Sequence, residues 1–386
     1  MSPRGFPEAE YRARVARAQA AMTDAGLAAL LLTTEPDVRY FTGFLTRFWE
    51  SPTRPWFLIV PAAGAPVAVI PSIGAALMGK TWLTDIRTWR SPDYEDDGVS
   101  LLADALCELV AEQDIIGVPS GAETHLRMPL GDWQTLQARA KGRAFHGDSG
   151  VMRRLRLVKS EAEIKKIGTA CSIADRAFAR VPEIAHAGVP LSDVFRRFQM
   201  LCLDQGANWV PYLAGAAAPG GYADVISPAT EQPLARGDVL MLDTGLVWDG
   251  YFCDFDRNFA IGPGAPNVQD AHARLIEATA AAFELARPGA TAADLFAVMD
   301  RIVTGGAGGS DAGRLGHGLG MQLTEPPSLI PADRTVLEPG MVLTLEPGIE
   351  VAPGRILVHE EDIVVRETGA EWLTAPAAPR IREILG

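Results

Sequence analysis

The sequence predicts an α/β N-terminal domain followed by an α+β domain, with the boundary between residues 152 and 153. Its 386 residues exceed what a single hydrophobic core usually serves. Residues 11–140 alternate helical and strand patterns, which is typical of an α/β domain. From residue 160 onwards the pattern is helix, helix, hairpin, helix, helix and strands, which favours an α+β domain.

The first domain begins with a predicted helix over residues 11–26, because apolar residues share one face and Gly26 is a typical helix end. A buried strand follows at 27–34. Residues 57–71 are strand-like with a turn near 64–66. The remaining predictions are a helix at 98–113, a strand at 115–119 and a helix at 126–140.

The second domain is predicted to open with a capped helix. Ser160 and Glu163 form a capping box, and the apolar residues that follow keep helical spacing. Two long helices are expected near 191–205 and 268–287. Small residues at 217–221 and 305–309 indicate loops, and the segment 214–227 is expected to border a pocket.

Residues 239–261 predict a β-hairpin that gathers carboxylates. Polar and apolar residues alternate on both sides of Asp249-Gly250, which is a strong hairpin signal. A two-residue turn there places Asp243 opposite Asp256, with Asp254 two residues along on the same face. The hairpin therefore predicts three carboxylates in one patch.

A second ribbon, residues 341–365, turns at Pro353-Gly354 and is predicted to place Glu346 opposite Glu361. Like charges in that position are destabilising unless a cation or a shared proton neutralises one of them. Pro-Gly is not the best hairpin turn, so a shifted register is an alternative. A single acidic residue on a strand is usually a solvated surface group, and the combination of the two ribbons is what favours a metal site.

His317 adds an imidazole to these carboxylates. It is flanked by glycines in residues 313–327, which allow close approach of backbone to a ligand, although a single histidine is more often a core or surface residue. We predict a two-metal site made of Asp243, Asp254, His317, Glu346 and Glu361. Such an oxygen-rich set suits Mn, Fe(II) or Co better than a structural zinc.

These residues lie in motifs that resemble the creatinase/prolidase/aminopeptidase P family, M24, which has the pita-bread fold. The motifs are LDTG at 242–245, GYFCD at 250–254, GHGLG at 316–320, LEPG at 345–348 and HEED at 359–362, and residues 11–44 and 153–167 are also similar to the family. The resemblance implies that Asp243 binds one metal, that His317 and Glu346 bind the other, and that Asp254 and Glu361 bridge the two. Glu346 would also handle the proton.

Three positions depart from the peptidases of this family. Their second histidine, seven residues after the metal histidine, is Thr324 here, and their histidine about 17 residues before the first aspartate falls near Ile226. Their arginine, two residues before the bridging glutamate, is His359. We expect Thr324 and His359 to serve catalysis in their place. The alternatives are a strand residue with a satisfied hydroxyl and a solvent-facing histidine.

Four further residues are predicted to bind substrate. Tyr222 and Asp256 are expected at the pocket, although Asp256 is also a candidate outer carboxylate or sixth ligand, paired with Arg257 in the simplest case. Two-domain members of the family are commonly homodimers, so Trp49 and Trp56 are expected to close the pocket of a partner chain. The alternative for both is a place in the core.

The predicted function is a dinuclear-metal-dependent hydrolase, similar to Xaa-Pro peptidases, that attacks an amide with a hydroxide held between two metal ions. Manganese is expected first, with Co, Fe or Zn as alternatives. Because the residues that handle substrate differ, a non-peptidase hydrolase or lyase, cleaving a C–N or a sulfonium C–S bond, is the main alternative. An inactive binding module is the third, although inactive relatives tend to lose the ligand set.

Composition is consistent with a cytoplasmic two-domain enzyme and says little about its substrate. The formal charge of −13 argues against nucleic acid or an anionic membrane as partner. The four cysteines show no paired spacing, which fits a reducing compartment. The N-terminus lacks an apolar leader, and no apolar stretch is long enough to span a bilayer.

Overall fold

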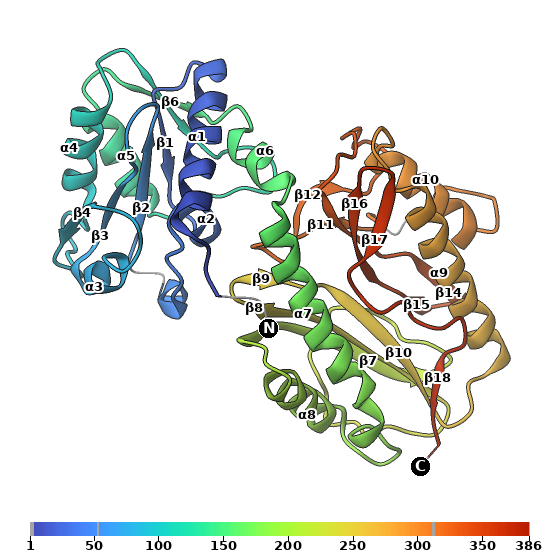
Figure 1. Ribbon diagram of the computed structural model, residues 1–386. Helices are drawn as coiled ribbons and strands as arrows, with labels where there is room; N and C mark the ends of the chain where they lie inside the picture. Colours follow the sequence, from blue (N-terminus) through green and yellow to red (C-terminus); the bar gives the residue numbers. More distant parts are fainter. Residues whose placement is uncertain (1–3, 52–53, 311–312, 386) are drawn as a thin grey trace. The chain divides into compact units, whose positions relative to one another are not determined.

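The computed structural model describes residues 4–51, 54–310 and 313–385. The chain divides into two compact units after Arg156, within α6 (Val151–Leu157), whereas the sequence predicted a boundary after residue 152. Both units are shown in Figure 1. Among the described residues, no helix is both long and apolar enough to cross a membrane.

The N-terminal unit is built on a six-stranded sheet with the order β4-β3-β2-β1-β5-β6. The two central pairings, β1 with β2 and β2 with β3, are antiparallel, and the other three are parallel. Strands β1, β2 and β3 are buried along their whole length, which explains their continuous apolar sequences. The strands are β1 (Ala29–Leu32), β2 (Phe57–Pro61), β3 (Val67–Pro71), β4 (Asp85–Trp89), β5 (Ile115–Val118) and β6 (Ala144–Gly147).

Helices connect these strands largely as the sequence predicts. The first ends at Gly26, whose φ of 66° is the left-handed conformation typical of a helix end. The short helix α2 was not predicted from the sequence. The helices are α1 (Glu8–Ala25), α2 (Glu35–Thr42), α3 (Ala75–Met78), α4 (Val99–Leu109) and α5 (Leu130–Arg139), with 3-10 turns at η1 (Arg47–Glu50) and η2 (Ser72–Gly74).

The C-terminal unit contains two five-stranded sheets and a two-stranded ribbon. One sheet has the order β18-β10-β8-β7 with β9 added to β8, the other has the order β12-β11-β13-β16-β17, and β14 pairs with β15. The strands are β7 (Trp209–Pro219), β8 (Asp238–Trp248), β9 (Tyr251–Phe252), β10 (Phe255–Ile261), β11 (His317–Gly318), β12 (Glu325–Ser328), β13 (Val342–Leu345), β14 (Gly348–Ala352), β15 (Arg355–Val358), β16 (Glu361–Arg366), β17 (Gly369–Trp372) and β18 (Arg382–Ile384).

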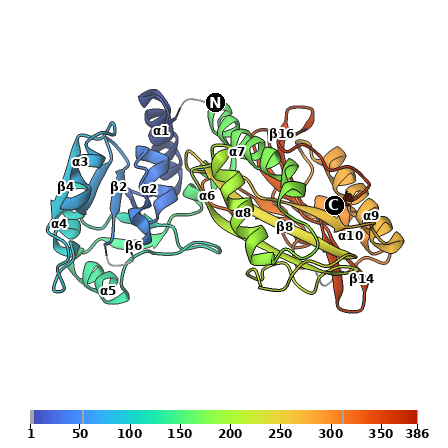
Figure 2. The ribbon, with the colours of Figure 1, turned by 90° about the horizontal axis from the view of Figure 1, so that it is seen from below.

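Four long helices cover these sheets. Helices α7 and α8 contact β8 and β7, while α9 contacts β13, β14, β15 and β17 and carries α10 on its side (Figures 1 and 2). The predicted capping box of Ser160 and Glu163 is present at the start of α7. The helices are α7 (Glu161–Ala179), α8 (Leu191–Asp204), α9 (Pro266–Leu285) and α10 (Ala292–Val303), with a 3-10 turn at η3 (Val181–Glu183).

The register of the first hairpin is confirmed. Asp243 pairs with Asp256, as a two-residue turn at Asp249-Gly250 requires. Both turn residues have positive φ, 49° and 80°, which is the conformation of a type I′ turn. Cys253, which precedes Asp254, is fully buried.

The register that the sequence predicts for the second ribbon is wrong by one residue. Glu361 pairs with Leu345, so Glu346 is opposed by Glu360. The physical reason is an irregularity between Glu350 and Ala352 that shifts the pairing near the turn. A shift of one residue turns every side chain to the other face of the strand.

Residues 209–219 form the long strand β7, which was not predicted and which includes the first part of the loop predicted at 217–221. Alanine and glycine have low β propensity, but the segment pairs along β8 over most of its length. A side chain at Gly215 would overlap the carbonyl oxygen of Met241, so the small residues here reflect close strand packing.

Candidate metal centre

A cavity of about 930 Å³ lies in the C-terminal unit, where the hairpin of β8 and β10 meets β11 and the β14–β15 ribbon. It combines a strongly acidic floor with an apolar wall. The carboxylates that line it are Asp243, Asp254, Asp256, Glu346, Glu350 and Glu360. The apolar residues that line it are Val225, Ile226, Val303, Leu323, Ile349, Ile356 and Val358.

His317, the first residue of β11, points its Nε2 atom at the carboxylates. This atom lies 3.0 Å from Glu346 Oε1 and 3.4 Å from Asp254 Oδ2. The other ring nitrogen, Nδ1, lies 2.8 Å from the carbonyl oxygen of Gly318 and donates to it. This hydrogen bond leaves Nε2 as the atom that binds a metal once it loses its proton.

Thr344 fixes both His317 and Glu346. Its hydroxyl accepts a hydrogen bond from the backbone N–H of His317 at 3.0 Å and donates to Glu346 Oε1. The approach requires glycine at 316, because a Cβ at this position, where φ is 141°, would overlap the carbonyl oxygen of Thr344. The glycines flanking the histidine therefore allow close strand packing behind the site.

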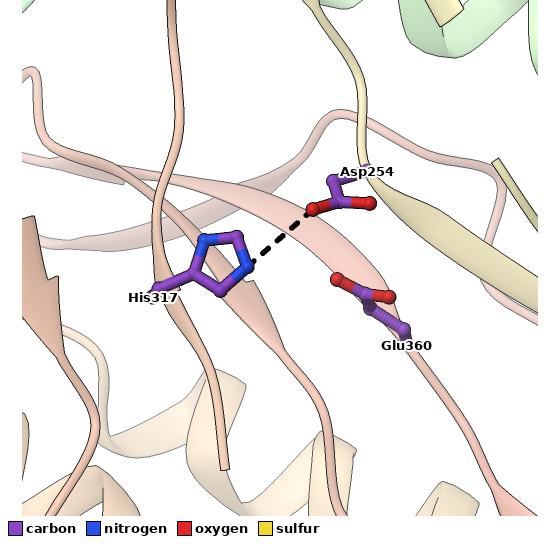
Figure 3. Close-up of side chains that lie close together, drawn as sticks. All are labelled: Asp254, His317 and Glu360. Atoms are coloured by element: carbon purple, nitrogen blue, oxygen red, sulfur yellow. Dashed lines mark ion pairs between the residues drawn. The ribbon is translucent and has the colours of Figure 1, made fainter. Parts of the chain in front are cut away.

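Glu360 completes the cluster. Ligand atoms of Asp254, His317 and Glu360 all lie within 4.8 Å of one another, a spacing that suits a single metal ion (Figure 3). Within the described chain, the buried atoms Glu360 Oε1 and Asp243 Oδ1 have no hydrogen-bond partner. Buried carboxylate oxygens are normally satisfied, so these two fit the role of ligands to a divalent cation.

The pKa values of the cluster show the same shortage of positive charge. Burial, and then the neighbouring carboxylates, raise the pKa values of Asp243 and Glu360 well above the ordinary range. Burial also raises the pKa of Asp254 to about 6, although His317 and Arg314 oppose the shift. Burial lowers the pKa of His317, but Glu346 and Asp254 outweigh it and raise the pKa to about 10. A divalent cation would neutralise this cluster.

Glu361, predicted as a bridging ligand, lies outside the cavity. Its carboxylate accepts hydrogen bonds from Arg257 Nη2 at 2.9 Å, from the Thr374 hydroxyl and from the N–H of Ala377 at 2.8 Å. Burial raises the pKa of Glu361, but Arg257 and His359 outweigh it and lower the pKa to about 2. The structure therefore places Glu360, the neighbouring residue, where the sequence analysis placed Glu361.

His359 is held between two carboxylates at the edge of the cavity. Its Nδ1 lies 3.6 Å from Asp256 Oδ1, and its Nε2 lies 3.2 Å from Glu361 Oε1. The predicted pairing of the Arg257 and Asp256 side chains is not formed, since Arg257 binds the Asp256 carbonyl oxygen and the Glu361 carboxylate. Asp256 Oδ1 instead accepts from the N–H of Glu360 at 3.3 Å, which makes Asp256 a support for the cluster.

Comparison with known proteins identifies the family. The profile of Metallopeptidase family M24 matches residues 165–367, and that of the Creatinase/Prolidase N-terminal domain matches residues 14–158. The chain belongs to metallopeptidase family M24. It is 33% identical over 375 residues to the probable dipeptidase PepE of Mycobacterium tuberculosis, covering 96% of each protein. The sequence-based prediction of the family is thereby confirmed.

Solved structures support the same assignment. Dipeptidase PepE from Mycobacterium ulcerans is 29% identical, with a TM-score of 0.84 over 98% of this chain and 99% of that chain. The prolidase from Thermococcus sibiricus is 25% identical, with a TM-score of 0.86 over 98% and 100%. The predicted α/β N-terminal domain and pita-bread domain of this M24 chain are confirmed.

The departures from the M24 peptidases lie inside the cavity. Ile226 and Thr324, at the positions of the two missing histidines, both line it. Ile226 is 78% exposed and extends the apolar wall. Thr324 accepts a hydrogen bond from Arg314 Nη2 at 3.3 Å. With Glu360 in the cluster, the position two residues earlier is Val358, so no arginine stands there either.

Tyr222 is not at the surface of the cavity. It is fully buried, and its hydroxyl donates to Asn258 Oδ1 at 3.1 Å and accepts from the N–H of Val358 at 2.8 Å. The prediction that Tyr222 contacts substrate is therefore corrected: its side chain holds β10 to the β14–β15 ribbon behind the cavity wall. Its neighbour Asp224 accepts hydrogen bonds from Ile226 and Ser227 and shapes the loop.

Trp49 and Trp56 lie in the N-terminal unit and are 7% and 1% exposed. Their ring centroids are 5.7 Å apart, and Trp56 also contacts Phe44 and Phe48. These contacts are those of core residues within that unit. The closure of a partner's pocket by either tryptophan stays a prediction.

Three residues of the site were missed from the sequence. Glu360 stands beside Glu361, and alternation along a strand allows only one of the two to face the cavity. Tyr212 donates its hydroxyl to Asp243 Oδ2 at 3.0 Å, but the strand that carries it was not predicted from the sequence. Arg314 lies three residues before His317 in a motif already singled out, so a charged residue beside a metal ligand was the available signal.

Proposed function

We propose that this chain is a metal-dependent dipeptidase that acts on Xaa-Pro and related small peptides. Its metal ligands would be Asp243, Asp254, His317, Glu346 and Glu360. The observation that carries the proposal is the convergence of these groups in one cavity, with buried oxygens of Asp243 and Glu360 that lack partners among the described residues. The dipeptidase relatives support a peptide as substrate.

The donor set fits two divalent cations. Four carboxylates and one imidazole favour manganese, with Co, Fe(II) or Zn as alternatives. When bound, such ions supply the means to acidify a water molecule and to polarise the carbonyl group of an amide. We propose that Asp243 would bind one cation, that His317 and Glu346 would bind the other, and that Asp254 and Glu360 would be shared by both.

Glu346 is the residue that we propose as the proton carrier. Its Oε1 is held by the Thr344 hydroxyl and by His317 Nε2. Burial raises the pKa of this carboxylate, but His317 and the Thr344 hydroxyl together outweigh burial and lower it. It would take the proton from the attacking water and return it to the leaving amine nitrogen.

The test is hydrolysis by protein stripped of metal and reloaded with Mn, Co, Fe(II) or Zn. The substrates are Xaa-Pro dipeptides, other dipeptides and longer Xaa-Pro peptides, and Glu346→Gln is the control that keeps the shape of the side chain. We expect metal-dependent dipeptide cleavage that falls by a factor of about 100 or more in the control. No turnover from protein shown to bind two metal ions would refute the proposal and favour a non-peptide amide or a C–S bond as the target.

Homodimer formation and a cytoplasmic location stay predictions. Size-exclusion chromatography with light scattering would test the first, and fractionation of the source cells the second.

A further inference from the structure

Arg314 lines the acidic cavity and has no ion-pair partner among the described residues. It is the one lysine or arginine among the described residues that line the cavity, alongside six carboxylates. Within the part of the chain that the structure describes, its guanidinium makes a single hydrogen bond, to the Thr324 hydroxyl at 3.3 Å. A guanidinium carries five N–H donors, so the single hydrogen bond to Thr324 leaves donors for a further acceptor.

The position of Arg314 relates it to the metal cluster. Its positive charge is among the causes that lower the pKa values of Asp254 and Glu346, although no carboxylate of the described chain lies within ion-pair distance of it. It therefore stands beside the cluster and remains available to another anion. A planar guanidinium with two parallel donors matches a carboxylate group better than any other common anion of peptides.

We propose that Arg314 determines specificity by binding the free α-carboxylate of a dipeptide, and that Thr324 positions Arg314. This inference rests on the proposed function, because it places the scissile amide at the metal cluster. In a dipeptide the carboxylate is one residue from that amide, whereas in longer peptides it is farther away. An enzyme with this anchor prefers dipeptides to their amides and to longer peptides.

The role of Thr324 follows from the same contact. From the sequence, Thr324 is expected to act in catalysis, in place of a histidine. The Thr324 hydroxyl accepts a hydrogen bond from Arg314, and this contact fixes the direction of the long Arg314 side chain. The two roles of Thr324 can be told apart by substitution. If Thr324 positions Arg314, its replacement affects only substrates with a charged C-terminus; if it acts in catalysis, its replacement affects charged and uncharged substrates alike.

The experiment compares one dipeptide with its C-terminal amide, which differ by a single charge. Arg314→Met, Thr324→Val and Thr324→Ser are the variants. Arg301→Met is the matched control, since Arg301 lies on α10, does not line the cavity and loses the same charge. The readout is the ratio of kcat/KM for the acid to kcat/KM for the amide.

We expect Arg314→Met to lower kcat/KM for the acid by about 10- to 100-fold, mainly through KM, and to leave the amide almost unchanged. Thr324→Val should lower kcat/KM for the acid alone, by a smaller factor, and Thr324→Ser should restore kcat/KM for the acid. An unchanged ratio in Arg314→Met overturns the proposal. An equal loss on acid and amide in Thr324→Val would assign that residue to catalysis instead.

Binding separates this inference from the proposed function. The acid and amide of a dipeptide analogue with a reduced, non-hydrolysable bond are titrated calorimetrically into the metal-loaded protein. Weaker binding of the acid alone to Arg314→Met supports the anchor even in a protein that hydrolyses no peptide. Equal affinities for acid and amide in the unaltered protein would refute the anchor even in an active peptidase.

Discussion

Glu360 and Glu361 are adjacent, and the structure gives them opposite roles, so their glutamine variants form a matched pair. Glu360 faces the metal cluster with a buried oxygen that lacks a partner in the described chain. Glu361 faces Arg257, Thr374 and Ala377. We expect Glu360→Gln to lose metal and activity while Glu361→Gln keeps metal but loses stability.

The size of the stability effect follows from the pKa of Glu361, which is lowered from 4.5 to about 2. A shift of this size corresponds to about 3 kcal/mol in the free energy of unfolding. Because the folded pKa is depressed, this contribution is present above pH 4.5 and is lost as the pH falls through 2. Glu361→Gln should therefore lower Tm by roughly 6–12 °C at neutral pH.

The ionisation of Glu360 has the opposite effect on the free energy of unfolding. Its pKa is raised by burial and by Glu346, so the folded protein without metal retains its proton at a pH where the unfolded chain has lost it. Its ionisation therefore opposes folding as the pH rises above 4.5. With metal removed by a chelator, Glu360→Gln should melt at the same temperature as the unaltered protein or higher.

The assays are metal counting by mass spectrometry after reloading, and thermal melting with a chelator present. The reasoning is refuted if Glu361→Gln loses a metal ion while Glu360→Gln retains both. It is also refuted if the two variants lose similar stability in the chelator, because a shared effect would show that the two side chains have similar surroundings.

Three further predictions follow from contacts around the site. Tyr212→Phe removes the hydrogen bond to Asp243 and should weaken metal binding about 10-fold, as measured by calorimetric titration, and unchanged affinity would exclude a role in orienting the ligand. Metal binding at pH 7 should release a proton from His317, because Glu346 and Asp254 outweigh burial and raise the pKa of this imidazole to about 10; titrations in buffers of different ionisation enthalpy count the protons released, and a count of zero contradicts the cluster electrostatics. Lys166→Met leaves its buried partner Asp249 without its ion pair and should destabilise the protein by about 3–5 kcal/mol in urea unfolding, with partial recovery in the Lys166→Met/Asp249→Asn double variant as the check.

Local signals in the sequence were sufficient for the first hairpin. Asp249-Gly250 adopts the two positive φ angles that a type I′ turn requires, and few other residue pairs do so readily. The turn then fixes the pairing of Asp243 with Asp256. The capping box at Ser160 and the helix end at Gly26 were predictable for the same reason, since each depends on hydrogen bonds or dihedral angles within a few residues.

The choice between Glu360 and Glu361 depended on the tertiary structure. Glu361 is the first residue of β16 and Glu360 directly precedes it, and the alternating pattern alone does not distinguish the two glutamates. An irregularity ten residues away decided it, because one extra residue in a ladder reverses the direction of every side chain beyond it.

The sequence by itself determined the family, the two-domain architecture and most of the residues that we propose as metal ligands, because motifs and turns carry these locally. The tertiary structure decided which residue we propose as the fifth ligand, the support from Tyr212, the burial of Tyr222 and the contact of Arg314 with Thr324. Each of the latter depends on the register or packing of segments that are distant in the chain. Local dihedral preferences place no constraint on such relations, which arise only when the sheets pair and pack.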